Sequence, residues 1–302
     1  MGLKAFIRKR GQKYTPALQD ARDRLLGYPI DTIDVTRPRR IETFPTTSPV
    51  PRIIVQTFRT PSVVRPIHSA VLKWTEMNPE FDYRFFDDTA ARDFIASRFG
   101  GDVLTAYDSL TPAAFRADLW RYCYLVAEGG VYVDIRMVPV LALRTILGFA
   151  DEAPPAFVAP RDQQGSGGGE GHSYLYNAFI AAAPDHPFLV AALDRAVGMI
   201  LDRNYGRDML EITGPGCFGA AVNDALDRPV DTRFEPGDHS HDSVGRYRIL
   251  SHEVDIYYQA VVRLAGRPAI VSKCIRGPMA NADKAHSGPG YGELYHQRAV
   301  FR

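Results

Sequence analysis

The sequence predicts an α/β fold, a sheet with parallel strands flanked by helices, and two observations lead to that prediction. Short runs rich in β-branched and aromatic residues alternate with longer segments of helical periodicity. Over residues 52–99 the order is strand, helix, strand, helix, which implies parallel pairing of the strands. We expect a basic helix and a proline-rich linker over residues 1–50 and a single domain over residues 51–302.

Composition excludes several classes of protein. The 302 residues are 45% apolar and 24% charged, as in ordinary globular proteins, and the net charge of +1 argues against nucleic acid as a partner. The cysteines, Cys123, Cys217 and Cys274, are widely spaced, which favours reduced core thiols over a disulfide framework or a zinc site. No apolar run approaches the ~20 residues that cross a bilayer, so we expect a cytoplasmic protein.

The first thirteen residues are basic and contain no acid. Two interpretations stay open: a solvated tail, or attraction to an anionic membrane surface that would make the protein membrane-associated. The basic residues are Lys4, Arg8, Lys9, Arg10 and Lys13.

The first half of the domain is predicted as follows. Strands cover residues 52–57 and 82–86, a helix covers 62–77, and Asp87 and Asp88 begin a helix over 89–99. Thr111 is expected to cap a further helix, with Pro112 at its first position.

That helix and the strand after it carry the residues of greatest interest. Gly129 and Gly130 end the helix, and residues 131–133 form a short buried strand that ends at Asp134. Asp118 and Arg121 share one face of the helix among apolar neighbours. They are either a self-satisfying ion pair or part of a site, and Asp134 favours the site because ligands bind at the carboxyl ends of strands in open α/β sheets.

The second half of the domain contains fewer signals. A turn and short helix are expected over residues 139–147, strands over 156–159 and 174–182, and helices over 188–203 and 217–226. The glycine-rich segment 165–171 lacks a P-loop ending and is interpreted as a mobile loop. His186 is expected in a turn. Residues 213–216 either form a tight turn that caps the helix after it or present backbone N–H groups to a ligand at the start of that helix. Residues 235–245, with His239 and His241, read as a surface loop rather than a metal site.

The stretch from Thr111 to Met137 resembles the DXD-containing sugar transferases of glycosyltransferase family 32. The pattern A-x-x-x-D-x-x-R-Y-x-x-L-x-x-x-G-G-x-Y-x-D carries the resemblance. Its matching residues are Ala114, Asp118, Arg121, Tyr122, Leu125, Gly129, Gly130, Tyr132 and Asp134. The resemblance implies a GT-A type, Rossmann-like mixed sheet flanked by helices. It also implies retaining transfer of a sugar from a UDP- or GDP-linked donor to a glycan or glycolipid acceptor, as in capsule and other polysaccharide biosynthesis.

The resemblance also implies roles for particular residues. The catalytic candidates are Asp118, Arg121, Asp134 and Asn177, whose amide would bind either a sugar hydroxyl or a backbone group. The donor-binding candidates are Gln56, Thr57, Asp118, Arg121, Tyr132, Asp134, Arg136 and His286.

One position departs from the family pattern, because Arg136 stands where the second aspartate of D-x-D is expected. Three interpretations stay open. Arg136 grips the diphosphate in place of a cation; or Asp134 and His286 hold Mn²⁺ or Mg²⁺; or the protein binds nucleotide sugars without catalysis. A Rossmann dehydrogenase is disfavoured, because no G-x-G-x-x-G follows a first strand.

Overall fold

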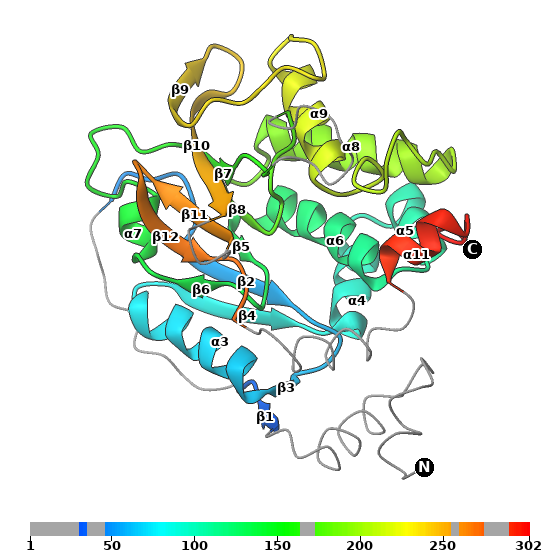
Figure 1. Cartoon of the computed structure of the whole chain (residues 1–302), viewed down its shortest axis with the longest axis horizontal. Helices are drawn as coiled ribbons and strands as arrows, with labels where there is room; N and C mark the ends of the chain where they lie inside the picture. Colours follow the sequence, from blue (N-terminus) through cyan, green and yellow to red (C-terminus); the bar gives the residue numbers. More distant parts are fainter. Residues whose placement is uncertain (1–29, 35–45, 164–172, 255–259, 275–289) are drawn as a thin grey trace.

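The structure, a computed structural model, describes residues 30–34, 46–163, 173–254, 260–274 and 290–302, and a ten-stranded mixed sheet forms its centre (Figure 1). The strands of this sheet are β2 (Ile53–Thr57), β4 (Asp82–Phe86), β5 (Gly130–Val133), β6 (Val138–Pro139), β7 (Phe157–Pro160), β8 (Phe179–Ala182), β9 (Gly237–His241), β10 (Gly245–Val254), β11 (Ala260–Leu264) and β12 (Arg267–Val271). They are ordered β4-β2-β5-β8-β7-β10-β11-β12-β6, with β9 paired to β10. A small second sheet pairs β1 (Ile30–Thr32) with β3 (Ser62–Val64).

Pairing within the sheet changes direction at β5. As predicted, β2 is parallel to β4, and it is also parallel to β5. The other neighbour of β5, β8, is antiparallel, so the start of β8 lies beside the end of β5. A backbone hydrogen bond from Asp134 N to Ala178 O, 2.8 Å long, continues this pairing past both strands. The arrangement therefore brings Asp134 and Asn177, distant in the sequence, to one edge of the sheet.

Helices cover both faces of the sheet (Figure 1). One face packs against α3 (Arg65–Met77) and α7 (Leu143–Ile146). Toward the other face lie α4 (Asp88–Arg98), α5 (Gly101–Ser109), α6 (Ala113–Glu128), α8 (Pro187–Leu201), α9 (Pro215–Ala225) and α11 (Tyr291–His296). Successive residues of one strand divide between the two cores, as Ile54 and Val55 do, because side chains alternate across a sheet. The fold is thus the predicted α/β class, a mixed sheet flanked by helices.

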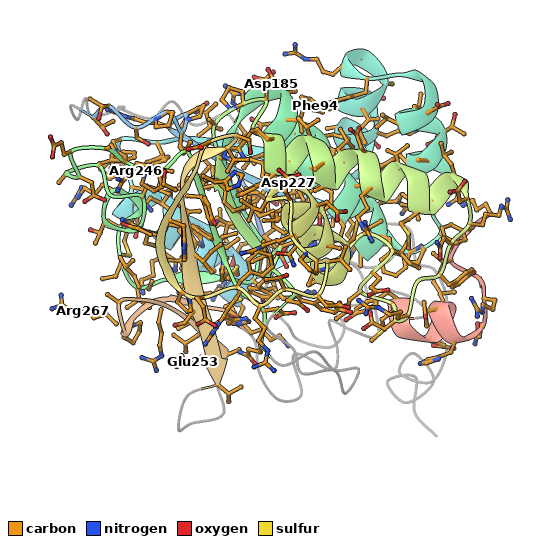
Figure 2. All side chains as sticks on the ribbon, turned by 90° about the horizontal axis from the view of Figure 1, so that it is seen from above. Phe94, Asp185, Asp227, Arg246, Glu253 and Arg267 are labelled. Carbon is orange, nitrogen blue, oxygen red and sulfur yellow. The ribbon has the colours of Figure 1, made fainter. Side chains whose placement is uncertain are left out.

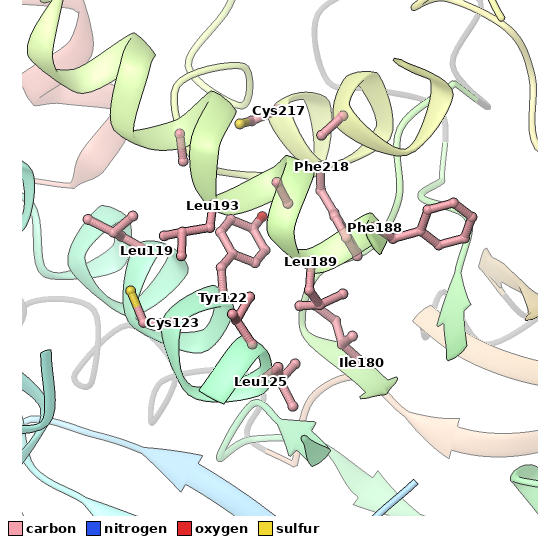
Figure 3. Close-up of a cluster of buried hydrophobic side chains, with 14 of the residues drawn as sticks. Leu119, Tyr122, Cys123, Leu125, Ile180, Phe188, Leu189, Leu193, Cys217 and Phe218 are labelled. Carbon is pink, nitrogen blue, oxygen red and sulfur yellow. The ribbon is translucent and has the colours of Figure 1, made fainter. Parts of the chain in front are cut away.

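The core between α6, α8 and α9 fixes the helix that carries Asp118 and Arg121. Figure 3 shows Leu119, Tyr122 and Leu125 of α6 facing Leu189 and Leu193 of α8. All five side chains are at most 6% exposed. The close packing of these side chains holds α6 in one orientation. Asp118 and Arg121, on the same helix, depend on that orientation for their contacts.

The start of α6 differs from the prediction. The helix begins at Ala113, with Pro112 rather than Thr111 at the capping position and no side-chain cap. Thr111 N instead donates to Val300 O over 2.8 Å, and Leu110 forms a β-bridge with Phe301. The C-terminal segment therefore keeps Thr111 out of the helix.

Two other segments also differ from the prediction. Strand β8 is shorter than the predicted 174–182, because the residues before Phe179 hydrogen-bond to loop ends and to α6. Residues 237–241, expected in a loop, form β9, in which Asp238 pairs with Arg248 of β10. Neither face of β9 carries apolar residues, so a pattern of alternating hydrophobic residues could not predict this strand.

Near the start of α3, residues 62–64 are strand rather than helix, and Pro66 lies in the first turn of α3. By contrast, Asp87 caps α4 as predicted, accepting a hydrogen bond from Ala90 N. His186 is the N-cap of α8, where its Nδ1 accepts from Phe188 N, and Gly214 is the N-cap of α9. The predicted turn roles of His186 and Gly214 are confirmed, but Pro215 and Gly216, expected in the turn, already belong to α9.

Charged side chains lie at the rim of the molecule. Arg246, Glu253 and Arg267 are exposed and project outward in the view of Figure 2. No disulfide joins Cys123, Cys217 or Cys274; Cys123 and Cys217 are buried and Cys274 is half-buried. Within the described ranges, no helix combines the length and apolarity needed to cross a bilayer. The N-terminal basic residues and the glycine-rich segment 165–171 lie outside the described residues.

Candidate functional site

Asp118 is held inside the protein by three donors that come from three separate elements. Arg121 Nη2 lies 2.9 Å from its Oδ1 and Asn177 Nδ2 lies 3.1 Å from the same oxygen. Thr213, just before α9, donates to Oδ2 over 3.0 Å. The side chain of Asp118 is 13% exposed. A buried carboxylate is tolerated where hydrogen bonds and an opposite charge replace water, and this cage supplies both.

Burial nevertheless dominates the titration of Asp118. It raises the pKa of the carboxyl from 3.8 to about 6, against the opposing effects of the Arg121 charge and the Thr213 hydrogen bond. Asp134 raises the pKa further through repulsion between like charges. The group therefore changes charge close to neutral pH, as functional carboxyls often do.

Arg121 is the link between the two carboxylates. Its Nη2 lies 2.9 Å from Asp118 and 3.5 Å from Asp134 Oδ1, and its Cζ lies 4.3 Å from the centre of the Tyr132 ring. Its Nη1 donates to the backbone oxygen of Asn177. Although burial lowers the pKa of the guanidinium, the nearby phenol and the two carboxylates outweigh burial and raise it. Arg121 is thus a fixed positive charge between two acids.

Asp134 is the exposed member of the group. Its side chain is 44% exposed, compared with 5% for Arg121. The Tyr132 hydroxyl donates to Asp134 Oδ1 over 2.6 Å, and burial raises the pKa of Tyr132 well above its ordinary value, so this phenol stays a donor. A carboxylate with one oxygen anchored and part of its surface open to solvent can accept hydrogen bonds from an incoming ligand.

Four predicted catalytic residues therefore meet at one place: Asp118, Arg121, Asp134 and Asn177. They come from α6, from the end of β5 and from the start of β8. The Asn177 amide donates to Asp118 and to the Tyr122 hydroxyl, at 3.1 and 3.2 Å. Both of these partners are side chains and not the backbone group that the sequence suggested; the suggested contact of Asn177 with a sugar hydroxyl stays a prediction.

Gln56 and Thr57 lie at the end of β2, the strand next to β5. Gln56 is fully buried, and its Oε1 accepts from the Tyr83 hydroxyl over 2.9 Å. Its Nε2 is buried and has no hydrogen-bond partner within the described part of the chain. Thr57 Oγ1 donates to Phe86 O over 2.8 Å, which ties β2 to β4. The donor-binding roles of Gln56 and Thr57 stay predictions.

Arg136 follows Asp134 in the turn after β5. Its Cζ lies 5.8 Å from the centre of the Phe58 ring, and its backbone oxygen accepts from Cys274 N over 2.8 Å. His286, the other predicted metal ligand, lies outside the described residues, so its role stays a prediction.

Binding of a divalent cation by Asp134 and His286 stays a prediction. In proteins that bind nucleotides, Mg²⁺ is commonly held by one or two carboxylates together with the phosphates of the substrate. Across the described ranges, no group of three or more histidines, cysteines and acids could hold a metal ion. Asp134 contributes one carboxylate, and Arg136 places a positive charge where a second carboxylate would stand.

Thr213 and Tyr122 belong to the site, although neither side chain was among the catalytic or donor-binding candidates from the sequence. The Tyr122 hydroxyl donates to Thr213 O over 2.8 Å, so a buried phenol of α6 holds the segment whose hydroxyl holds Asp118. The sequence does place the Tyr122 hydroxyl on the apolar face of a helix, and a buried hydroxyl of this kind needs a hydrogen-bond partner. No local pattern could identify that partner, because it lies ninety-one residues away.

A comparison with protein families matches residues 67–151, from α3 through α7, to the family described as "Glycosyltransferase sugar-binding region containing DXD motif". Asp118, Arg121, Asp134 and Arg136 all lie within this match. The resemblance inferred from the sequence is confirmed for this stretch.

Curated relatives agree with that match. The chain is 29% identical over 141 residues to "Inositol phosphoceramide mannosyltransferase 3" of Schizosaccharomyces pombe, covering 47% of this chain and 35% of the relative. It is 27% identical over 206 residues to "Initiation-specific alpha-1,6-mannosyltransferase" of the same organism, covering 59% and 49%. The chain thus spans about a third to a half of the length of these relatives.

Among solved structures, the chain is similar to one titled "PaToxG Glycosyltransferase", with a TM-score of 0.43 and 16% identity. The match covers 74% of this chain and 79% of that one.

Proposed function

Because residues 67–151 form a glycosyltransferase sugar-binding region, we propose that this protein transfers a sugar from a nucleotide-diphospho-sugar to a hydroxyl acceptor. The observation that carries the proposal is the cluster in which Arg121 lies 2.9 Å from Asp118 and 3.5 Å from Asp134. Two carboxylates that accept hydrogen bonds, with a fixed positive charge between them, suit a ligand that carries both hydroxyls and phosphate.

The proposed roles follow from burial. Asp118, buried and rigidly held, orients donor sugar hydroxyls through its remaining lone pairs. Arg121 keeps Asp118 in place and attracts the donor. Asp134, the most exposed of the three, reaches the ribose or sugar. The precision of such a cage matters because a reacting group misplaced by about 1 Å costs roughly a hundredfold in rate.

Negative charge grows on the diphosphate as the sugar leaves, so the site must stabilise it. We assign that task to Arg136, since a guanidinium matches phosphate geometry in a bidentate way and Arg136 follows Asp134 by two residues. If a Mn²⁺ or Mg²⁺ ion were held by Asp134 and His286, it would supply Lewis-acid charge at the same place.

The finer features of the proposal come from the resemblance and the relatives. Retention of anomeric configuration follows the family pattern in the sequence. Both relatives are named as mannosyltransferases, one of them as an inositol phosphoceramide mannosyltransferase, so we propose a hexose donor, with GDP-mannose the first to test, and a glycolipid or glycan acceptor.

Release of UDP or GDP from a panel of nucleotide hexoses tests the proposal. We expect release by the wild type, a loss of a hundredfold or more in Asp118→Asn, and release that survives EDTA but falls in Arg136→Ala. Arg267→Ala, which removes an exposed arginine at the rim, is the matched control and should release at the wild-type rate.

Two other outcomes would change the proposed function or the role of Arg136. Loss of release in EDTA with recovery in Mn²⁺ would assign the diphosphate to a cation instead of Arg136. Tight binding of a nucleotide sugar with no release, with or without acceptor, would favour a non-catalytic nucleotide-sugar-binding protein. The substitution of arginine for the second aspartate at position 136 makes that the second candidate.

A further inference from the structure

A second polar cluster lies beside the candidate site, built from Asp162, Tyr176, His252 and Ser272. His252 Nε2 lies 3.0 Å from Ser272 Oγ, and His252 Nδ1 lies 3.5 Å from Asp162 Oδ1. The rings of Tyr176 and His252 stack with centres 4.0 Å apart and planes 24° apart. His252 thus contacts each of the other three side chains, Asp162, Ser272 and Tyr176.

The sheet explains why these residues meet. Asp162 follows β7, Ser272 follows β12, and His252 lies near the end of β10, which is parallel to β7. His252 is 6% exposed and Ser272 is 3% exposed. Polar groups as deeply buried as these need partners, and a cluster of them usually serves a purpose beyond packing.

Tyr176 connects this cluster to the candidate site. It directly precedes Asn177, whose side chain donates to Asp118, while the Tyr176 ring itself stacks on His252. Burial raises the pKa of the Tyr176 phenol, and the carboxylate of Asp134 raises it further. The hydroxyl therefore lies within the electrostatic reach of Asp134 and keeps its proton at neutral pH.

The serine, histidine and acid do not suit nucleophilic catalysis. Ser272 is almost fully buried, and its hydroxyl is hydrogen-bonded to His252. An attacking serine needs access to its substrate. Tyr176, by contrast, is half-buried, so the cluster is arranged to hold that phenol.

We propose that Tyr176 binds a hydroxyl of the donor sugar, and that Ser272, His252 and Asp162 are positioning residues that hold its phenol in place. This inference rests on the proposed function. The ligand is a sugar hydroxyl and not the diphosphate, because the diphosphate is assigned to the Arg136 guanidinium and a phenol is a neutral group. A phenol hydroxyl can both donate a hydrogen bond to a sugar hydroxyl and accept one from it.

Donors that each lack one hydroxyl test the proposal. Tyr176→Phe lowers kcat/KM about tenfold on the parent donor, the expected effect of one lost hydrogen bond. One of the deoxy donors shows the same loss with the wild type, and on that donor Tyr176→Phe causes no further loss. A role in packing alone would lower kcat/KM equally for every donor.

The positioning role is tested by a double-mutant cycle. His252→Gln lowers kcat/KM severalfold in the wild type but has no effect when Tyr176 is already phenylalanine, because it acts through that residue. Ser272→Ala repeats the test should the histidine variant not fold, as judged by thermal unfolding. Tyr247→Phe is the matched control, since Tyr247 is a buried phenol on β10, at 6% exposure, whose ring packs on Phe188.

Several outcomes would overturn the inference. They are a Tyr176→Phe enzyme that keeps the wild-type preference among the deoxy donors, or additive effects of His252→Gln and Tyr176→Phe. If the wild type releases nucleotide normally and Tyr176→Phe matches it, this inference fails and the proposed function stands. If the wild type neither releases nucleotide nor binds any nucleotide sugar, both the proposed function and this inference fail.

Discussion

A single buried carboxyl, Asp118, sets the electrostatics of the candidate site. Its pKa is raised to about 6 by burial, even though Arg121 and Thr213 favour the charged form. In the unfolded chain the pKa of this carboxyl is near 3.8, lower than in the folded protein. Ionisation of Asp118 therefore lowers the free energy of unfolding as the pH rises from 3.8 to about 6. A cost of this kind, kept in the native state, is common at sites that bind or react.

The pH dependence of nucleotide release should report this group. As the pH falls through about 6, Asp118 takes up a proton and weakens its hold on Arg121, so kcat/KM should fall. Initial rates between pH 4.5 and 8.5 in buffers of constant ionic strength measure the profile. A profile that stays flat down to pH 4.5 would contradict the assignment.

Thr213→Val should move that profile in a defined direction. The Thr213 hydroxyl lowers the pKa of Asp118 by its hydrogen bond, so removing it raises the pKa and shifts the fall in activity to higher pH. Thr105→Val is the control, because the Thr105 hydroxyl is exposed on α5 and bonds only to the backbone of its own helix. A fall at unchanged or lower pH in Thr213→Val would oppose this account.

At the scale of elements, the turn between α6 and β5 fixes the distance between the two acids. Gly129 and Gly130 have φ angles of 63° and 102°, which residues with side chains rarely adopt. A Cβ on Gly129 would lie 2.7 Å from Pro184 N, and one on Gly130 would lie 2.9 Å from Ile53 O. The turn therefore tolerates only glycine at both positions.

Gly129→Ala should lower the free energy of unfolding by at least about 1–2 kcal/mol, the cost of a left-handed residue with a side chain, with the clash in addition. Gly198→Ala is an informative control, because Gly198 lies inside α8 with no atom near its would-be Cβ. That substitution should stabilise the protein by roughly 0.5–1 kcal/mol. Urea unfolding of both variants would show opposite signs, and equal signs would argue against this view of the turn.

Sequence reasoning succeeded where an element is defined by its own residues. The strand Asp82–Phe86, the capping of α4 by Asp87 and the glycine turn after α6 are all local signals, and they are confirmed. The predictions were wrong where contacts with distant segments determine the local structure. Thr111 lies outside α6 and donates to Val300 O, and residues 237–241 form a strand because they pair with β10.

The same distinction holds for the candidate site. Asp118, Arg121 and Asp134 belong to one continuous pattern, so their meeting could be predicted. Thr213 reaches Asp118 because the segment before α9 packs against α6. This packing leaves no mark in a short stretch of sequence.

At the scale of the whole molecule, a hydrophobic core lies on each face of the sheet. The reactivity of the three thiols depends on how deeply each is buried in or beside these cores. Burial raises the pKa of Cys217 to about 12 and also raises that of Cys123, and both lie in the core beneath α6, α8 and α9. Cys274 is half-buried beside the other core. A thiol reagent should therefore modify one cysteine quickly in the native protein and two more only after denaturation. Rapid modification of all three would contradict this packing.

The central claim is that Asp118, Arg121 and Asp134 surround the sugar of a nucleotide-sugar donor. A crystal structure of the protein with a bound, non-hydrolysable donor tests it most directly. We predict that sugar hydroxyls lie within hydrogen-bond distance of Asp118 and Asp134, with the diphosphate beside Arg136. A donor whose sugar lies elsewhere, with both carboxylates still bonded only to the protein, would contradict the claim.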